Sequence, residues 1–232
     1  MTAIRTARDR ARAELTREIK DEARRQLAAA GADRLSLRSV ARELGMVSSA
    51  LYRYFPSRDD LLTALIIDAY NALGEVAENA DAAQPTSDRR GRWRAVCRAV
   101  RSWARAHPHE YALIYGSPIP GYRAPEDTVV PAGRVALVLV GLVRETWDAG
   151  DLAPAFDGPA PTPVLSEQLE RLAALIAPQL PGPVLSRLVI AWTQLFGMIS
   201  FELFGQLVGS VDPSEDFFEN TVEQIATFVG IR

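Results

Sequence analysis

One stretch of the chain, Leu35–Leu62 (LSLRSVARELGMVSSALYRYFPSRDDLL), limits what the rest can fold into. Its first segment repeats apolar residues at i, i+3, i+4 and i+7, the spacing of a helix with one buried face: Leu37, Val40, Ala41 and Leu44. Gly45 follows directly and can take a positive φ, as a turn requires. A second segment begins at Ser48 or Ser49, both good N-cap residues. Two short helices around a tight turn predict a helix-turn-helix, whose second helix enters the major groove of DNA.

These residues resemble the DNA-binding domain of TetR-family transcriptional regulators, which usually reads IAxxxGVS…LYxHFxxKxxLL. Three departures occur here: Val47 and Ser48 shift the usual Gly-Val-Ser by one position, Tyr54 replaces the common His, and Arg58 replaces the common Lys. Tyrosine keeps a ring with a polar tip and arginine keeps a cation, so the departures concern sequence preference. The resemblance implies a ligand-responsive regulator, a repressor that a small hydrophobic effector releases from a palindromic double-stranded DNA operator.

The position of each residue in this motif predicts the contacts with DNA. Leu51 and Phe55 should hold the recognition helix to the core. Arg53 could fork onto a guanine, whereas Tyr52 and Arg58 should bind phosphate, which positions the protein without specifying sequence. The full predicted set comprises Ser36, Arg38, Ser48, Ser49, Ala50, Tyr52, Arg53, Tyr54 and Arg58. The Arg-rich residues 1–13 are either a frayed terminus or a basic arm on DNA.

The charge distribution suits this prediction despite a net charge of −3. Residues 1–60 hold 13 basic and 9 acidic residues, and residues 61–232 hold 13 and 20, so positive charge gathers beside the helix-turn-helix. The longest apolar run, around Val135–Val143, is too short to span a bilayer, and the N-terminus lacks the apolar segment of a signal peptide. With a single cysteine, Cys97, the sequence predicts a cytoplasmic protein without a membrane partner.

The whole chain is expected to be all-α. A helix-turn-helix domain should occupy residues 1–60, ordered from about residue 14, and a larger helical domain for ligand binding and dimerisation should occupy residues 61–232. Ser57 is the predicted N-cap of a long helix that links the two. The apolar segment from Val135 to Trp147 predicts a buried central helix, and no alternation long enough for a sheet occurs.

The last two predicted helices, from Pro183 and from Ser214, carry an apolar stripe suited to association. Trp192-x4-Gly197-x4-Glu202-x2-Gly205 resembles the C-terminal region of a TetR subgroup in which this helix pair forms the homodimer interface. The two glycines suggest a close approach between helices. The predicted interface comprises Leu188, Leu195, Ile199, Leu203, Phe217, Phe218 and Ile225. The alternative is that this stripe is ordinary core.

Six aromatic side chains could line an effector pocket: Trp103, Tyr111, Tyr115, Trp147, Trp192 and Phe196. Aromatic residues at helical spacing are also common in plain cores, so this alternative stays open. Few charges lie nearby in sequence, which favours an apolar or aromatic effector. Its binding is expected to shift the long helix that begins at Ser57 and so weaken operator binding.

An enzymatic function is not expected, because the sequence lacks a catalytic constellation. His107 and His109, the only histidines, flank a proline two positions apart and do not share a helix face. No nucleophile elbow, phosphate-binding loop or zinc-protease motif occurs, so no metal and no cofactor are predicted. Two alternatives within regulation remain, an activator and a regulator controlled by a protein partner instead of a small molecule.

Overall fold

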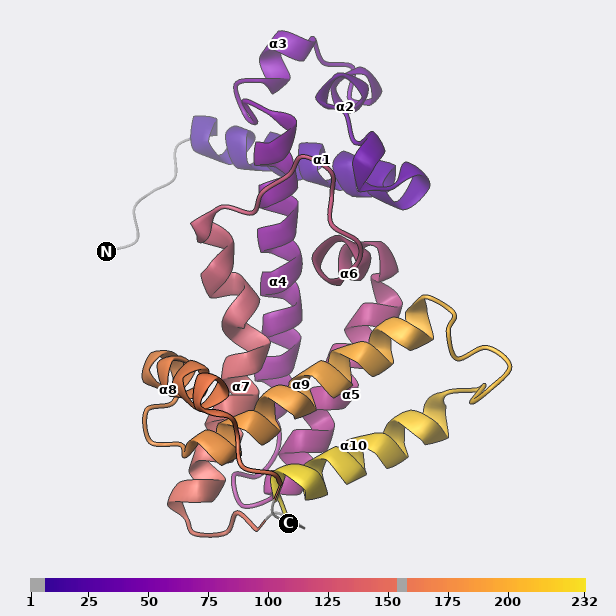
Figure 1. Ribbon diagram of the computed structural model, residues 1–232. Helices are drawn as coiled ribbons and strands as arrows, with labels where there is room; N and C mark the ends of the chain where they lie inside the picture. Colours follow the sequence, from indigo (N-terminus) through magenta and orange to yellow (C-terminus); the bar gives the residue numbers. More distant parts are fainter. Residues whose placement is uncertain (1–6, 154–157) are drawn as a thin grey trace. The chain divides into compact units, whose positions relative to one another are not determined.

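The computed structural model describes residues 7–153 and 158–232, and these ranges contain helices and no strand, as the sequence predicts (Figure 1). The α-helices are α1 (Ala7–Ala30), α2 (Leu37–Glu43), α3 (Ser48–Leu51), α4 (Arg58–Ala82), α5 (Arg89–Ala106), α6 (Pro108–Tyr115), α7 (Val129–Asp148), α8 (Pro163–Ile176), α9 (Gly182–Leu203) and α10 (Glu215–Val229). Short 3-10 turns, η1 (Ala32–Arg34) and η2 (Glu126–Thr128), precede α2 and α7.

The chain forms two compact units. Unit 1 comprises Met1–Tyr70 and His107–Val129, and unit 2 comprises Asn71–Ala106 and Val130–Arg232. Helix α4 therefore begins in unit 1 and ends in unit 2. Unit 1 extends beyond the predicted residues 1–60 because Leu113 of α6 and the loop residues Ile119 and Tyr122 pack against the same core as the N-terminal helices.

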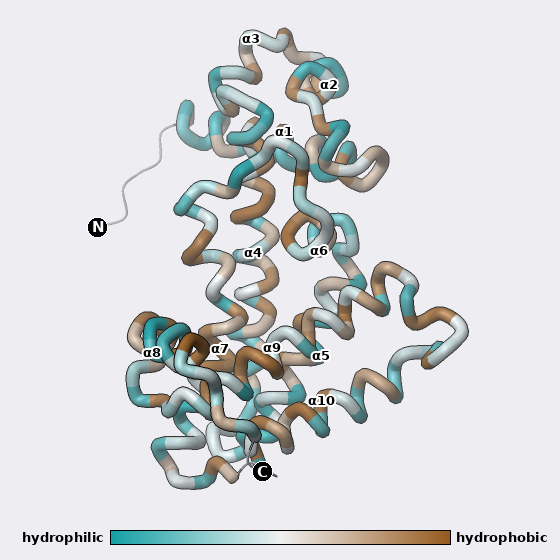
Figure 2. The backbone as a smooth tube through the Cα atoms, in the orientation of Figure 1, coloured by the Kyte–Doolittle hydropathy of each residue, from teal (hydrophilic) through white to brown (hydrophobic). Residues whose placement is uncertain are grey.

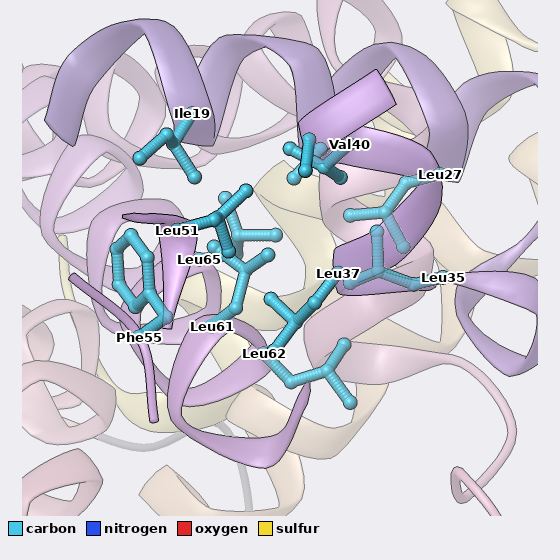
Figure 3. Close-up of a cluster of buried hydrophobic side chains, with 12 residues drawn as sticks. Ile19, Leu27, Leu35, Leu37, Val40, Leu51, Phe55, Leu61, Leu62 and Leu65 are labelled. Carbon is cyan, nitrogen blue, oxygen red and sulfur yellow. The ribbon is translucent and has the colours of Figure 1, made fainter. Parts of the chain in front are cut away.

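The core of unit 1 joins α1, α2, α3 and the start of α4. Figure 3 shows its side chains converging from these helices, among them Ile19, Val40, Leu51 and Leu61, which are fully buried. Burial of such a side chain contributes about 1.5–3 kcal/mol relative to exposure. The helical spacing of apolar residues in the sequence therefore identifies the buried face correctly, and this face fixes the two short helices α2 and α3 against α1.

A glycine turn separates α2 from α3, and a serine caps the start of α4. Gly45 has a φ of 65° between α2 and α3, and the amide of Met46 closes the turn onto the Ala41 carbonyl at 2.8 Å. At the start of α4, Ser57 Oγ accepts from the Asp60 amide at 3.1 Å and donates to the Asp60 carboxylate at 2.7 Å. This confirms Ser57 as an N-cap. Helix α3, in contrast, begins at Ser48 itself, so Val47 occupies the N-cap position without a capping side chain.

Helix α1 begins at Ala7 rather than near residue 14. Its first eight residues, 7–14, are all exposed and consist mostly of alanine and arginine, which have high helix propensity. Residues 7–13 of the Arg-rich stretch 1–13 are thus regular helix. Residues 1–6 of that stretch lie outside the described residues.

Unit 2 is built on contacts of α9 with α5, α8 and α10, and of α5 with α10. Helices α9 and α10 run side by side in opposite directions (Figure 1). Fully buried side chains include Trp93 of α5, Leu142 of α7 and Phe218 of α10. The expectation of a buried central helix over Val135–Trp147 is wrong in part, because Leu137 and Trp147 are exposed. Hydrophobic residues, brown in Figure 2, recur along α7 and α9.

Among the described helices, α9 is long and apolar enough to cross a membrane by length and composition. However, 44% of its most apolar window is buried inside the chain, and the core helix of a globular protein meets the same criterion. This helix, rather than the run at Val135–Val143, is the most apolar long segment.

Helix α5 contains seven arginines and no acidic residue. Four of them, Arg90, Arg94, Arg98 and Arg101, form ion pairs at 2.5–2.7 Å with a row of glutamates on α10: Glu215, Glu219 and Glu223. We call this set the arginine ladder. Because these residues recur every three or four positions on both helices, the ladder fixes the register of α10 on α5.

Arg101 is the most buried member of the ladder. Its Nε and Nη2 donate to the Glu202 carboxylate of α9 at 2.7 and 2.8 Å, and its guanidinium lies 4.5 Å from the ring centroid of Phe218. Burial raises the pKa of Glu202, but the hydrogen bonds from Arg101 and Ser214 and the charges of Arg101 and Arg105 outweigh it, so the net pKa is lowered. The glutamate of the Trp-Gly-Glu-Gly pattern is thus an internal ion-pair partner.

Candidate DNA-binding surface and regulatory sites

The candidate DNA-binding surface centres on α3, which the core of unit 1 holds from below. Leu51 and Phe55 are buried, and the amides of Tyr54 and Phe55 both donate to the Leu51 carbonyl, at 2.8 and 3.1 Å. Figure 3 shows both side chains pointing into the buried cluster. The opposite side of this helical turn therefore faces outward, as the predicted division between core and surface residues requires.

Three predicted DNA-contacting residues of this segment are exposed: Ser49, Tyr52 and Arg53. The Tyr52 side chain is 42% exposed although it is a large aromatic residue. Ser48 and Ala50 are half-buried. These residues present hydroxyls, a methyl group and a guanidinium, the groups that contact phosphates and base edges. On the neighbouring helix α2, Arg38 is exposed.

Ser36 and Tyr54 lie closer to the protein interior than the other predicted contacts. Ser36 occupies the N-cap position of α2, with φ −137° and ψ 124°, but its side chain makes no capping hydrogen bond. The ring of Tyr54 packs against the core of unit 1, and the guanidinium carbon of Arg12 lies 5.1 Å from the ring centroid. Tyr54 is therefore held within the protein on two sides.

Arg58 makes contacts that the motif does not reveal. Its Nη2 donates to the Ala32 carbonyl at 2.8 Å and its Nε donates to the Leu35 carbonyl at 3.2 Å. These carbonyls lie in the connection between α1 and α2, so Arg58 ties the start of α4 to that connection. Two of its donor groups are thereby occupied, which favours a structural role over the predicted phosphate contact.

The predicted effector-site residues fall into separate groups in the two units. In unit 1, Tyr111 is buried and its ring lies 5.1 Å from that of half-buried Tyr115, which also meets Tyr70 edge-on at 6.0 Å. Burial raises the pKa of Tyr115, and the nearby Tyr70 and Tyr111 raise it further, so this phenol stays neutral at ordinary pH. In unit 2, Trp192 lies 5.9 Å from Phe196.

Trp103 and Trp147 complete the predicted effector-site set. Trp103 is buried on α5, whereas Trp147 is 40% exposed near the end of α7. Two grooves of similar volume lie in the described part of unit 2. One, of about 610 Å³, runs between α9 and α10, and the other, of about 650 Å³, lies between the start of α8 and α9. None of the six predicted aromatic residues lines either groove, although Ile190 and Phe228 line both.

The predicted dimer-interface residues are mostly buried inside the chain itself. Leu188, Leu195, Ile199, Phe218 and Ile225 are each at most 7% exposed, so they have no surface to offer a second copy. Leu203 is half-buried and Phe217 is partly exposed. Helices α9 and α10 and the turn after α9 instead expose a different apolar set, which we call the α9 face: Ile190, Gly197, Phe201, Phe204 and Phe217.

The helical spacing in the sequence could not separate the buried stripe of α9 from its exposed stripe, because both are apolar. The two glycines behave differently from each other. Gly205 follows the helix with a φ of 79°, and a Cβ at Gly197 would meet nothing within 4 Å. The close helix approach expected at Gly197 is therefore not made within the described part of the chain.

The described residues include no group of three or more His, Cys, Asp and Glu side chains that could hold a metal ion. Sequence reasoning also missed Arg12, which contacts the end of α3 as described above. An arginine in a polar, Arg-rich helix start gives no sequence signal for such a contact.

Comparisons with known proteins agree with this geometry. A model of bacterial regulatory proteins of the tetR family matches residues 19–65, and a model of the tetracyclin repressor-like C-terminal domain matches residues 93–225. The HTH-type transcriptional regulators Mb1846 of Mycobacterium bovis and Rv1816 of Mycobacterium tuberculosis are each 40% identical over 199 residues, covering 84% of this chain and 83% of their own length.

Solved structures give the same result for the fold. A candidate regulatory protein, SCO4313, is 35% identical with a TM-score of 0.78 and covers 95% of this chain and 98% of its own. A Rhodococcus sp. RHA1 protein of unknown function is 26% identical with a TM-score of 0.68, and the match covers 91% and 93% of the two chains. The named relatives are transcriptional regulators and not enzymes, and the family models cover both the helix-turn-helix and most of the C-terminal helices. The chain is a DNA-binding transcriptional regulator of the TetR family.

Proposed function

We propose that the protein is a cytoplasmic, ligand-responsive repressor that binds a palindromic DNA operator as a homodimer. In this proposal residues 1–60 supply the DNA-binding domain, and residues 61–232 bind the effector and dimerise. The observation that carries the proposal is the outward presentation of Ser49, Tyr52 and Arg53 from a short helix and the turn after it, whose other side is packed into a hydrophobic core. Rigid support of this kind lets a few side chains read DNA with defined geometry.

Each exposed group suits a different contact. Arg53 can donate two hydrogen bonds to a guanine edge, and the half-buried Ala50 methyl can meet a thymine methyl. Ser48, Ser49 and Tyr52 carry hydroxyls that can reach bases or phosphates, and Arg38 on α2 can bind the backbone. Arg58 and Tyr54 support this surface from beneath, since their side chains are engaged within unit 1.

The homodimer is proposed to form through the α9 face rather than through the residues buried beneath it. Phe201 is 55% exposed and Phe204 44%, which is costly for large aromatic side chains facing water. Exposed Gly197 lies on the same helix and leaves room for a helix of a second copy to approach closely. Two copies related by a two-fold axis would match the two halves of a palindromic operator.

The effector is proposed to be small and hydrophobic. The supporting observations are the neighbouring tyrosine rings of unit 1, the Trp192–Phe196 pair of unit 2 and the side chains of Ile190, Ile225 and Phe228 in the groove between α9 and α10. A displacement of α4 on effector binding would act on the helix-turn-helix through Arg58, which joins the first turn of α4 to the carbonyls before α2. The recognition helices would then lose the spacing that the operator requires.

The test begins with selection of preferred duplexes from a randomised DNA library by the full chain. A repressor with two-fold symmetry should select a palindrome with half-site centres about 10 base pairs, or a multiple of this, apart. Footprinting of the selected duplex is then repeated with hydrophobic compounds that raise the melting temperature of the protein. A selected site without symmetry would contradict the dimer, and a footprint unaffected by every stabilising compound would contradict release by an effector.

A reporter gene placed behind the selected duplex distinguishes the mode of regulation. Repression that a stabilising compound relieves is expected. Increased transcription on expression of the protein would show an activator. Repression relieved only by a protein partner would show control without a small molecule.

A further inference from the structure

The recognition helix α3 is unusually short, and residues expected to read DNA lie both in it and in the turn that follows it. It spans only Ser48–Leu51, followed by a turn at residues 52–54. The amides of Arg53, Tyr54 and Phe55 use the carbonyls of Ala50 and Leu51. A helix end leaves its last carbonyls without intrahelical donors, and these groups carry partial negative charge. The carbonyl of Arg53, one of the residues expected to read DNA, lies in the turn, two residues beyond the last residue of α3.

Arg12 of α1 supplies both a donor and a positive charge at this turn. Its Nη2 lies 3.4 Å from the Arg53 carbonyl oxygen, a long contact whose strength comes mainly from charge. The guanidinium carbon also lies 5.1 Å from the ring centroid of Tyr54, within the range of a cation–π interaction. One side chain thus contacts two consecutive residues of the turn that follows α3.

The other partners of this contact are themselves fixed. The ring of Tyr54 packs against the core of unit 1, and Leu15, one turn after Arg12 on α1, packs against the same core. Thr16 Oγ1 donates to the Arg12 carbonyl at 2.8 Å. The α1 backbone and the Tyr54 ring are therefore held in place, and Arg12 joins them across the surface of the unit.

We propose that Arg12 is a positioning residue that holds the turn after α3 and fixes the orientation in which Tyr52 and Arg53 meet DNA. The inference rests on the proposed role of α3 as the DNA-reading helix. It assigns the specificity-determining geometry partly to α1, outside the helix-turn-helix. It also assigns a role to the tyrosine at position 54, whose electron-rich ring face receives the guanidinium.

The inference predicts a loss of sequence-specific binding without the loss of a phosphate contact. The probes are the duplex selected by the wild-type protein and a mixed-sequence duplex of equal length, each titrated over a series of NaCl concentrations. Arg12→Ala should weaken binding to the selected duplex about tenfold, the combined effect of one cation–π contact and one weak charged hydrogen bond. Binding to the mixed-sequence duplex and the slope of log affinity against log salt should stay unchanged.

Five further variants make the test specific. Arg17→Ala removes the same charge from an exposed position of α1 and should leave both affinities unchanged. Tyr54→Leu removes the ring contact and keeps the hydrogen bond, so it should weaken specific binding less than Arg12→Ala does. The double variant should be no weaker than Arg12→Ala, because both changes break the same ring contact. Tyr54→Phe keeps the ring face and should lose less specific affinity than Tyr54→Leu. Arg12→Lys keeps a cation near the ring and should restore part of the loss.

Three other results would contradict either the positioning role of Arg12 or the recognition surface on which it rests. If Arg12→Ala weakens binding to both duplexes and reduces the salt slope by about 1.8, the value for one phosphate contact in each half-site, then Arg12 contacts a phosphate directly and the positioning role is wrong. If Arg12→Ala has no effect while Arg53→Ala weakens specific binding, the positioning role is wrong and α3 still reads DNA. If Arg53→Ala is also without effect, the proposed recognition surface itself fails.

Discussion

The buried contact between Arg101 and Glu202 allows a quantitative prediction about what holds unit 2 together. The side chains of Arg101 and Glu202 are 6% and 14% exposed, and two hydrogen bonds join them. Replacing Arg101 by Met keeps most of the side-chain volume but leaves the Glu202 carboxylate buried, with Arg105 at 3.7 Å as its remaining ion-pair partner. Replacing Glu202 by Leu leaves Arg101 paired with the largely exposed Glu215.

The burial of the Arg101–Glu202 pair sets the size of the expected losses in the free energy of unfolding. Loss of one partner of a buried ion pair costs about 3–5 kcal/mol, because the other charge stays desolvated. Because Arg105 and Glu215 remain as ion-pair partners, each single variant should lose about 3 kcal/mol of stability, the lower end of this range. The double variant Arg101→Met/Glu202→Leu leaves no uncompensated buried charge and should lie within about 1 kcal/mol of the wild type. Arg98→Ala breaks an exposed pair of the same ladder and should cost at most about 1 kcal/mol.

Urea unfolding followed by circular dichroism measures these differences at one fixed protein concentration, because a dimer is stabilised by mass action. The expected order of the free energy of unfolding places the double variant above both single variants. If the double variant loses the sum of the two single losses, the residues act independently and the ion-pair explanation is wrong. Equal losses in Arg101→Met and Arg98→Ala would show that burial of the pair does not matter.

Three further predictions concern other parts of the structure. Phe201→Asp should convert the proposed homodimer to monomer, as measured by sedimentation velocity. Leu175→Asp, at an 81% exposed position of α8, is the control and should leave the dimer intact. Equal dimer content in the two variants would contradict the α9 face as the interface. The hydrogen bond from Arg98 lowers the pKa of Glu219, and the pKa of Glu202 is also lowered, so their stabilisation is present above about pH 4.5 and lost as the pH falls below it. A melting temperature that does not fall between about pH 5 and about pH 2 would argue against this. Ser57→Ala should lower the free energy of unfolding by about 1 kcal/mol, because it removes the hydrogen bond from the Asp60 amide that caps α4. Ser36→Ala should lower it by less, since the Ser36 side chain makes no capping hydrogen bond. A larger loss in Ser36→Ala than in Ser57→Ala would refute the assignment of the caps.

The fold of the DNA-binding end was predictable because its signals are local. The spacing of Leu37, Val40 and Leu51 defines the buried faces, and Gly45 takes the positive φ that its position requires. The start of α4 at Ser57 follows from side-chain chemistry within four residues. Such signals need no knowledge of the rest of the chain.

The contacts made by charged side chains were not predictable, because their partners are far apart in sequence. Arg58 was expected on phosphate but donates to carbonyls 23 and 26 residues earlier. Arg101 reaches Glu202 across 101 residues. The sequence shows that α5 is rich in arginine, but only the folded chain shows that α10 places glutamates opposite it.

The association surface shows a different limit. Both faces of α9 are apolar, so helical spacing identifies a hydrophobic helix without saying which side the chain itself covers. The structure covers Leu188, Leu195 and Ile199 and exposes Phe201 and Phe204. The exposed residues of α9 therefore lie about half a helical turn from the predicted interface residues, on the opposite face of the helix.

The most direct test of α3 as the DNA-reading helix is a second selection from the randomised duplex library with Arg53→Ala. Each good bidentate contact to a base is worth about 1–3 kcal/mol of discrimination against the wrong base. The wild-type protein should select one base strongly at a symmetric pair of positions, and Arg53→Ala should accept other bases there while the remaining positions keep their preference. Identical selected sequences from both proteins would contradict the assignment of α3 to the major groove.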